Sequence, residues 1–217
     1  MRRSLYALSL AVLLLSPVAC AHSADSPTAA TSQKPQANPL KVAETKAALR
    51  DLWLGHIFSI RTVAVATMDK NGSARETAEK GVVANAQQIA GSIEPFYGKP
   101  ASDKLFTLLA GHYGAIRDHL DATAAGNSAQ QELAVKQLTA NAAEISTFLS
   151  GANPHLPKDA VMGLLTAHAA HHLTQFQQLK DGDYTHEAAT WTGMKSHIYV
   201  VADALTDALA AQFPNKF

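Results

Sequence analysis

The sequence predicts an all-α protein, a helical bundle built from three repeated αα-hairpins with a period of about 56 residues. Two observations support this fold class. From Leu40 onward, apolar residues recur at intervals of three and four, which places them on one face of a helix, and no useful stretch alternates as a half-buried strand does. The sequence also resembles itself when it is shifted by one period, as repeat architectures do.

The repeat is clearest around a set of histidines. Residues 52–61 and 108–117 share a Leu, a Gly-His pair and an Ile-Arg pair at equivalent positions, and residues 164–168 align with 108–112. The third copy has diverged further than the first two. Each predicted hairpin carries one of these histidines on its first helix: His56, His112 and His168.

Six amphipathic stretches follow one another along the domain. They cover residues 49–67, 73–93, 102–123, 128–148, 157–179 and 183–208. Within each hairpin the two helices are separated by residues that favour turns, namely Asn71-Gly72, Gly126-Asn127 and Asp181-Gly182-Asp183. Ser73 and Ser128 each precede a Glu or Gln by three residues, the spacing of a capping box, so the second and fourth helices are expected to begin at these serines.

The N-terminal segment has the features of an export signal. Arg2 and Arg3 precede an apolar run that is too short to span a bilayer, and small residues follow it, so residues 1–19 are expected to be a signal peptide. Residues 20–40, rich in Ser, Thr, Ala, Gln and Pro, are expected to be a flexible tether. The helical-bundle domain is then residues 41–217.

Two cleavage sites compete in this segment. Cleavage before Cys20 would leave a cysteine for lipid attachment, although a bacterial lipobox usually has Leu where this chain has Pro17. Cleavage after Ala21 would release an unmodified chain. The expected location is the periplasmic side of a bacterial membrane, with a lipid anchor at Cys20, and the alternative is secretion to the periplasm.

Composition and charge exclude several classes of function. The 18 Lys and Arg residues balance 18 Asp and Glu residues, so no basic surface field favours nucleic acid. Cys20 is the only cysteine, which excludes an internal disulfide, a cysteine zinc site and covalent haem attachment. A membrane contact through the lipid anchor is the one partner that we expect, and a protein partner is not identified.

The second helix of each hairpin carries a polar residue opposite the histidine of the first. These residues are Asn85, Asn141 and His197. In the first hairpin, His56 and Asn85 would differ in height by about 5 Å across an antiparallel pair, a gap that side chains bridge. Three pairs, His56 with Asn85, His112 with Asn141 and His168 with His197, are therefore expected to form a polar layer inside the bundle.

This layer has two interpretations. In one, it is a buried hydrogen-bond network that sets the register of the helices in a structural or partner-binding bundle. In the other, it binds a metal ion or metal cofactor, because His168 and His172 are spaced as a two-point chelate and His197 replaces an asparagine. The expected ligands are His56, His112, His168, His172 and His197, supported by Asn85 and Asn141. A small organic ligand beside the layer is a further alternative.

Imidazole ligands suit copper or zinc, ahead of a haem held by two axial histidines. Met194 is either a soft ligand or, more commonly for methionine, a core residue. His119 is either a second-layer ligand or a rim residue, and His171 is expected to face solvent.

The sequence lacks the patterns of the common enzyme sites. It has no Glu-x-x-His pair of a di-iron bundle, no phosphate loop, no dinucleotide fingerprint and no Ser-His-Asp arrangement. Its acids, among them Glu76, Asp118, Glu132 and Glu144, fall off the apolar stripes, where a hydrolytic zinc enzyme would need a general base. We therefore expect a binding protein and not an enzyme.

Several segments resemble a family of small, uncharacterised bacterial helical-bundle proteins. These are Trp53-x-x-His56-x-x-x-x-Arg61, Asn85, the segment 93–98 (IEPFYG) and the segment 152–154 (ANP). The resemblance spans about residues 48–213 and implies the bundle fold. It also implies a set of four histidines at positions 56, 112, 168 and 197, and it implies nothing about substrate.

We predict that the mature protein begins at Cys20 and is acylated there, because a long polar tether follows this lone cysteine. Mass spectrometry of protein extracted from bacterial membranes should show an N-terminal residue heavier than cysteine by its lipid chains. An unmodified chain that begins at His22 would instead establish simple secretion.

Overall fold

The computed structural model describes residues 36–217, and these residues form helices without any β-strand. The long helices are α1 (Pro39–Met68), α2 (Gly72–Gly91), α4 (Lys99–Ala125), α5 (Ser128–Ala152), α6 (Lys158–Asp181) and α7 (Tyr184–Gln212). The short elements are α3 (Glu94–Tyr97) and η1 (Pro214–Lys216). The prediction of an all-α protein is confirmed. The predicted signal peptide, Cys20 and most of the tether lie outside the described residues.

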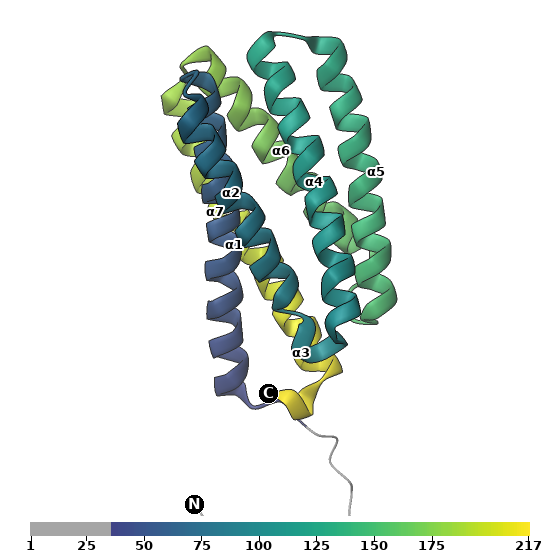
Figure 1. Cartoon of the computed structure of the whole chain (residues 1–217). Coiled ribbons are helices and arrows are strands. Elements are labelled where there is room, and N and C mark those ends of the chain that lie inside the picture. The colour runs from purple at the N-terminus through teal and green to yellow at the C-terminus, as the bar shows by residue number, and fades with distance from the viewer. Residues whose placement is uncertain (1–35) are drawn as a thin grey trace, which may run out of the picture. The chain divides into compact units, whose positions relative to one another are not determined.

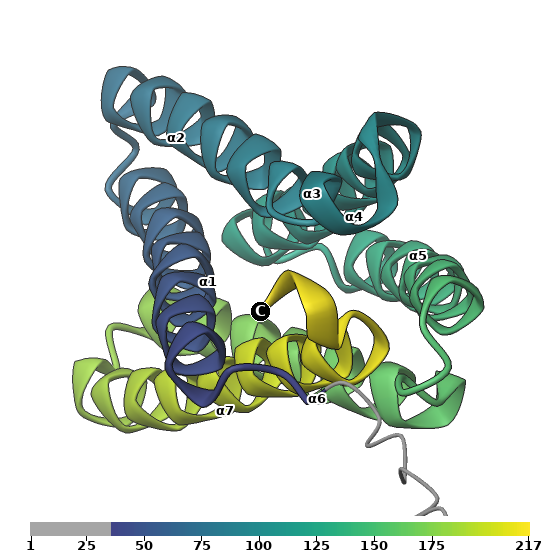
Figure 2. The same cartoon turned by 90° about the horizontal axis from the view of Figure 1, so that it is seen from below.

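The six long helices are arranged in a ring. Each helix packs on the next in the order α1, α2, α4, α5, α6 and α7, and α7 packs back on α1. Figure 2, seen along the bundle, shows this order. The long helices run side by side along the bundle (Figure 1). The helices α1, α4 and α6 also contact one another across the centre, so their facing sides meet in the core. A residue on the central face of any of these three helices can therefore reach the other two.

The turns between α1 and α2, α4 and α5, and α6 and α7 have the same backbone pattern. In each turn a backbone amide reaches back five residues, as in the bonds Asn71 to Ala66, Asn127 to Ala122 and Asp183 to Gln178. This pattern is typical of a helix that ends in a left-handed residue. The three equivalent positions are Lys70, Gly126 and Gly182, with φ of 54°, 71° and 69°.

The same turns correct the predicted helix starts. The side chain of Asn71 accepts a hydrogen bond from the Ala74 amide, and Asn127 accepts one from the Gln130 amide. Helices α2 and α5 therefore begin directly after these asparagines, and Ser73 and Ser128 do not cap them. A short Asn side chain in the turn reaches a free amide of the first helical turn, so no capping box is needed.

The core has two different halves. Between the histidines and the α1–α2 turn, one apolar cluster fills the interior with Ile60, Val63, Ile116, Leu120 and Phe176, each at most 2% exposed. The half towards α3 is closed at its end by Phe96, Phe213 and Phe217, whose rings contact one another. The histidines lie between these two apolar halves.

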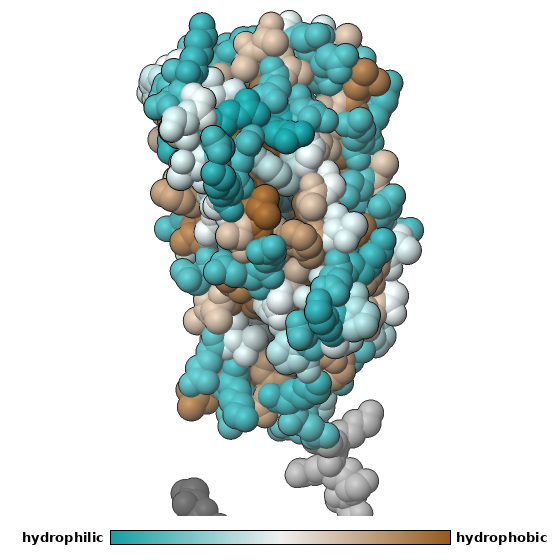
Figure 3. Space-filling model, viewed as in Figure 1, coloured by the Kyte–Doolittle hydropathy of each residue, from teal (hydrophilic) through white to brown (hydrophobic). Residues whose placement is uncertain are grey.

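On the face seen in Figure 3, apolar surface occurs in small, separate areas among hydrophilic residues. Salt bridges also join neighbouring helices at the surface, with Lys46 to Asp207 at 2.9 Å between α1 and α7, and Arg75 to Asp121 at 2.6 Å between α2 and α4. Among residues 36–217, no helix has the length and apolar character that a bilayer crossing requires.

The shared turn geometry predicts that Lys70→Gly stabilises the protein. A left-handed residue with a side chain costs about 1 kcal/mol, and glycine relieves most of this strain. We expect the free energy of unfolding, measured by urea denaturation, to rise by about 0.5–1 kcal/mol. The matched control is Gly182→Ala, which should lower it by a similar amount because a Cβ there meets no atom within 4 Å and only the strain remains. A decrease for Lys70→Gly would contradict the prediction.

Candidate metal centre

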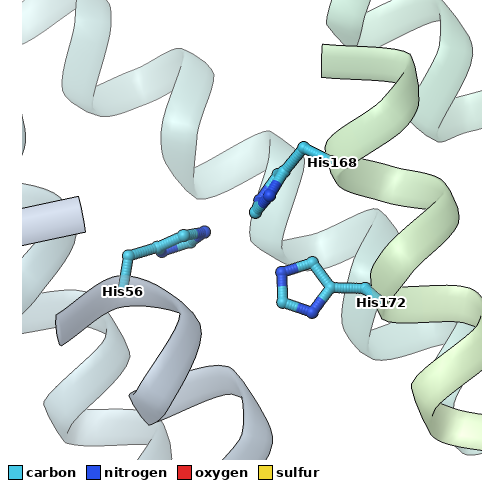
Figure 4. Close-up of side chains that lie close together, drawn as sticks. All are labelled: His56, His168 and His172. Carbon is cyan, nitrogen blue, oxygen red and sulfur yellow. The ribbon is translucent and has the colours of Figure 1, made fainter. Parts of the chain in front are cut away.

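Three histidines from two of the central helices converge on one point of the core. His56 projects from the middle of α1, and His168 and His172 project from successive turns of α6 (Figure 4). Each offers a ring nitrogen, and these three atoms lie within 4.8 Å of one another. The ring centroids of His168 and His172 are 4.6 Å apart, and His56 lies 5.5 Å and 6.1 Å from them. We call these three residues the histidine cluster.

The histidine cluster is buried and lacks the hydrogen bonds that buried imidazoles normally make. His168 and His172 are 1% and 0% exposed. Within residues 36–217, neither ring nitrogen of either residue has a hydrogen-bond partner. A buried polar group without a hydrogen-bond partner destabilises the folded state by about 1–3 kcal/mol. Four such nitrogens in one stable core are therefore unusual. Their lone pairs are free for a ligand that is not a protein group.

His112 of α4 lies beside the histidine cluster in a fixed protonation state. Its ring stacks almost parallel to His168, with centroids 6.2 Å apart. The Nδ2 group of Asn141 donates to the carbonyl of Leu108 at 3.0 Å, so the Oδ1 atom is the one that faces Nδ1 of His112 at 3.1 Å. Nδ1 must therefore carry the proton. This leaves a lone pair on Nε2 of His112, which is buried and has no partner in the described chain.

The polar residues of the outer helices form hydrogen bonds with backbone carbonyls. Each donates to a carbonyl of the first helix of its hairpin: Asn85 to Leu52 at 3.0 Å, Asn141 to Leu108 at 3.0 Å and His197 to Leu164 at 2.9 Å. Of the three expected side-chain pairs, only His112 with Asn141 forms a hydrogen bond in the described residues. His56 turns away from Asn85 towards α6, where the histidine cluster forms.

The structure therefore does not bring His197 to the predicted ligand set. Its Nε2 atom is engaged by the Leu164 carbonyl, and its ring lies 5.6 Å from His171, outside the histidine cluster. His197 performs the same task as the asparagines in the other two hairpins, because an imidazole N–H can replace an amide N–H as a donor.

The remaining candidate residues also lie outside the histidine cluster. His119 contacts Thr123 through Nδ1 at 3.3 Å and packs on the ring of Phe176. His171 is partly exposed. Met194 is fully buried in an apolar cluster that includes Trp53, which is the core role that methionine commonly has.

The environment keeps the imidazoles neutral. Burial lowers the pKa of His56 to about 3, with a contribution from His112. Burial also lowers the pKa of His112 to about 4, although its hydrogen bond to Asn141 acts in the opposite direction. The pKa values of His168 and His172 are also well below the usual range, first because of burial and then because of the neighbouring histidines. Neutral imidazole is the form that binds metal, so these side chains are ready to coordinate at neutral pH.

A half-buried ion pair that the sequence patterns did not indicate supports the helices around the cluster. Glu187 of α7 is 3% exposed and binds Arg61 of α1 through both oxygens, at 2.6 Å and 2.8 Å. Gln175 of α6 donates to the same carboxylate at 2.7 Å. Arg61 belongs to the repeated motif, but its partner Glu187 has no equivalent Glu in the other hairpins, so periodicity alone could not identify the pair.

No protein-family model, curated protein or solved structure matches this chain. The resemblance of its motifs to uncharacterised helical-bundle proteins stays a prediction, and the site is interpreted from its own geometry.

The low pKa values predict that the metal-free protein loses stability in acid. The unfolded chain takes up protons on these histidines below about pH 6.5, whereas folded His112 does so only near pH 4. Between about pH 6.5 and pH 4 the unfolded chain therefore binds more protons than the folded chain. The free energy of unfolding should fall with decreasing pH by up to about 1.4 kcal/mol per pH unit for each such histidine.

Urea denaturation of His112→Gln tests this slope. Between about pH 6 and pH 4.5, the variant should lose less stability than the wild type, by about 1.4 kcal/mol per pH unit. His155→Gln, which changes an exposed histidine outside the core, is the control. Equal slopes for wild type and His112→Gln would contradict the assignment.

Proposed function

We propose that the protein binds one transition-metal ion, copper or zinc, through His56, His168 and His172. The observation that carries this proposal is the set of unpartnered ring nitrogens in a buried group of three histidines. A metal ion replaces the missing hydrogen bonds with coordination bonds. A histidine layer that served only as a hydrogen-bond network would leave its central members satisfied, as Asn141 and His197 are.

The geometry fits a small ion after modest adjustment. Three nitrogens that bind one Zn²⁺ at about 2.0–2.1 Å lie about 3.3–3.5 Å apart. The nitrogens of the histidine cluster are within 4.8 Å, so rotation of the side chains must close the remaining difference. His168 and His172 share one helix and approach as a chelate, and His56 completes the triangle from α1. Nε2 of His112 lies nearby and can act as a fourth metal ligand or as a hydrogen-bond acceptor.

We infer that the outer residues Asn85, Asn141 and His197 have the structural role that the second interpretation assigned to the whole layer. Each ties the second helix of a hairpin to the carbonyl four residues before the histidine of the first helix. Together with the three similar turns, these bonds support the interpretation of the bundle as three repeated hairpins. The outer residues of the layer would then fix the register of the helices, and the histidines at its centre would form the metal site.

The proposed role is binding, for storage, sensing or delivery of the ion, and not catalysis. Glu187 is the buried acid among residues 36–217, and Arg61 and Gln175 hold its carboxylate. A general base beside the metal is therefore not supplied. With the predicted signal peptide and acylated Cys20, the protein would handle the metal on the periplasmic side of a bacterial membrane.

Thermal unfolding with and without metal tests the proposal. Wild-type protein should melt about 5–10 °C higher with copper or zinc at about 100 times the dissociation constant, because a ligand of the folded state stabilises it by about 2.7 kcal/mol. His172→Leu should abolish this shift. Without metal, His172→Leu should be at least as stable as wild type, since leucine replaces an imidazole that has no hydrogen-bond partner.

The matched control is His197→Asn, which should keep the metal-dependent shift. Asparagine at the two equivalent positions makes the same bond to backbone, so this change retains the donor to Leu164. Trp53 gives a second readout, because its ring lies 5.8 Å from that of His56 and its fluorescence should fall when Cu²⁺ binds. If neither copper, zinc nor haem shifts the melting of wild-type protein, the metal proposal is wrong.

A further inference from the structure

An apolar cavity of about 70 Å³ adjoins the histidines on the side of α3. His56, His112 and His168 form its inner end, and His172 does not line it. The rest of its lining is aliphatic or aromatic over most of its extent and includes Leu49, Leu109, Ile145, Leu165, Val201 and Leu205. We call this space the apolar cavity.

The hydroxyl and carboxamide groups in this lining already have hydrogen-bond partners. Ser92 donates to the Ile89 carbonyl at 2.7 Å, and Tyr97 donates to Gln212 at 2.6 Å. Asn153 donates to both Tyr97 and the Ala208 carbonyl at 3.0 Å. Among the described residues the lining includes no charged side chain. A charged or strongly polar guest would therefore lose its hydration without compensation.

We propose that the apolar cavity is a binding site for a small, uncharged, apolar molecule that lies against the histidines. Its volume exceeds the share of about two water molecules in the liquid, which is about 30 Å³ each, and apolar cavities in proteins take up guests such as xenon. The guest class is therefore a diatomic gas or a short hydrocarbon. The open hydrogen-bond acceptors at its inner end come from the unpartnered ring nitrogens of His112 and His168.

The apolar cavity does not depend on the proposed metal. If a metal is bound, the cavity determines the side from which a further ligand would reach it. Three protein ligands on zinc or copper leave a further coordination position for an exogenous ligand. Because His56 and His168 line the apolar cavity and His172 does not, that position would face the cavity. A guest would then approach the ion from the apolar side of the bundle.

Xenon binding to metal-free protein tests the cavity alone. Methyl resonances of Leu109, Leu165 and Leu205 should shift in a saturable manner with xenon pressure, whereas those of Val63 in the opposite half of the core should not. Chelator is present throughout, so failure of metal binding cannot affect this result. Absence of saturable shifts in wild-type protein would overturn the proposal.

Two variants of α7 give the matched comparison. Ala204 lines the apolar cavity, and Ala204→Leu should fill it and abolish the xenon shifts. Ala210 of the same helix packs against the apolar core without lining the cavity, so Ala210→Leu should retain the xenon shifts. Unchanged xenon binding in Ala204→Leu would contradict the assignment. If that variant does not fold, Leu109→Ala replaces it, and this enlarged cavity should bind benzene where wild type binds xenon only; no gain of benzene binding would also overturn the proposal.

Discussion

The structure depends on the burial of neutral imidazoles where three central helices meet. His56, His112, His168 and His172 occupy one level of a core that is apolar above and below them. Desolvation keeps them uncharged, and neutral imidazoles can still bind metal or accept hydrogen bonds. The helices that carry them, α1, α4 and α6, must contact one another directly, which they do across the centre of the six-helix ring.

The helix pairs α1–α2, α4–α5 and α6–α7 use their histidines differently, and this difference creates the candidate site. In the second hairpin, His112 bonds to Asn141, and its orientation is set within the hairpin. In the first, His56 leaves Asn85 and turns towards α6. In the third, His172 adds a second imidazole one turn after His168. A symmetric layer would keep each histidine beside the polar residue of its own helix pair, whereas this arrangement brings ring nitrogens of three histidines to one point.

Two sets of polar contacts hold that point in place from outside. Arg61 of α1 and Gln175 of α6 both bind the buried carboxylate of Glu187 in α7, and loss of Arg61 would leave this charge uncompensated. The carbonyl contacts of Asn85, Asn141 and His197 fix each outer helix to its inner neighbour. These contacts fix the register of the helices, so the histidines are not needed for it. Their ring nitrogens are therefore free to bind a ligand.

The sequence by itself determined the local features of this protein. Helical periodicity predicted the six long helices, turn residues marked the ends of the hairpins, and the repeat placed His56, His112 and His168 on the central faces of successive first helices. The spacing of His168 and His172 already indicated a chelate, because residues four apart share a helix face.

Only the tertiary structure decided which side chains meet. Pairing within a hairpin follows from its register, and it correctly matched His112 with Asn141. The contact of His56 with α6 joins helices far apart in the chain, and it depends on ring closure and on the rotamers that packing selects. The partner of Arg61 and the apolar cavity depend on the same long-range packing, which no local spacing encodes.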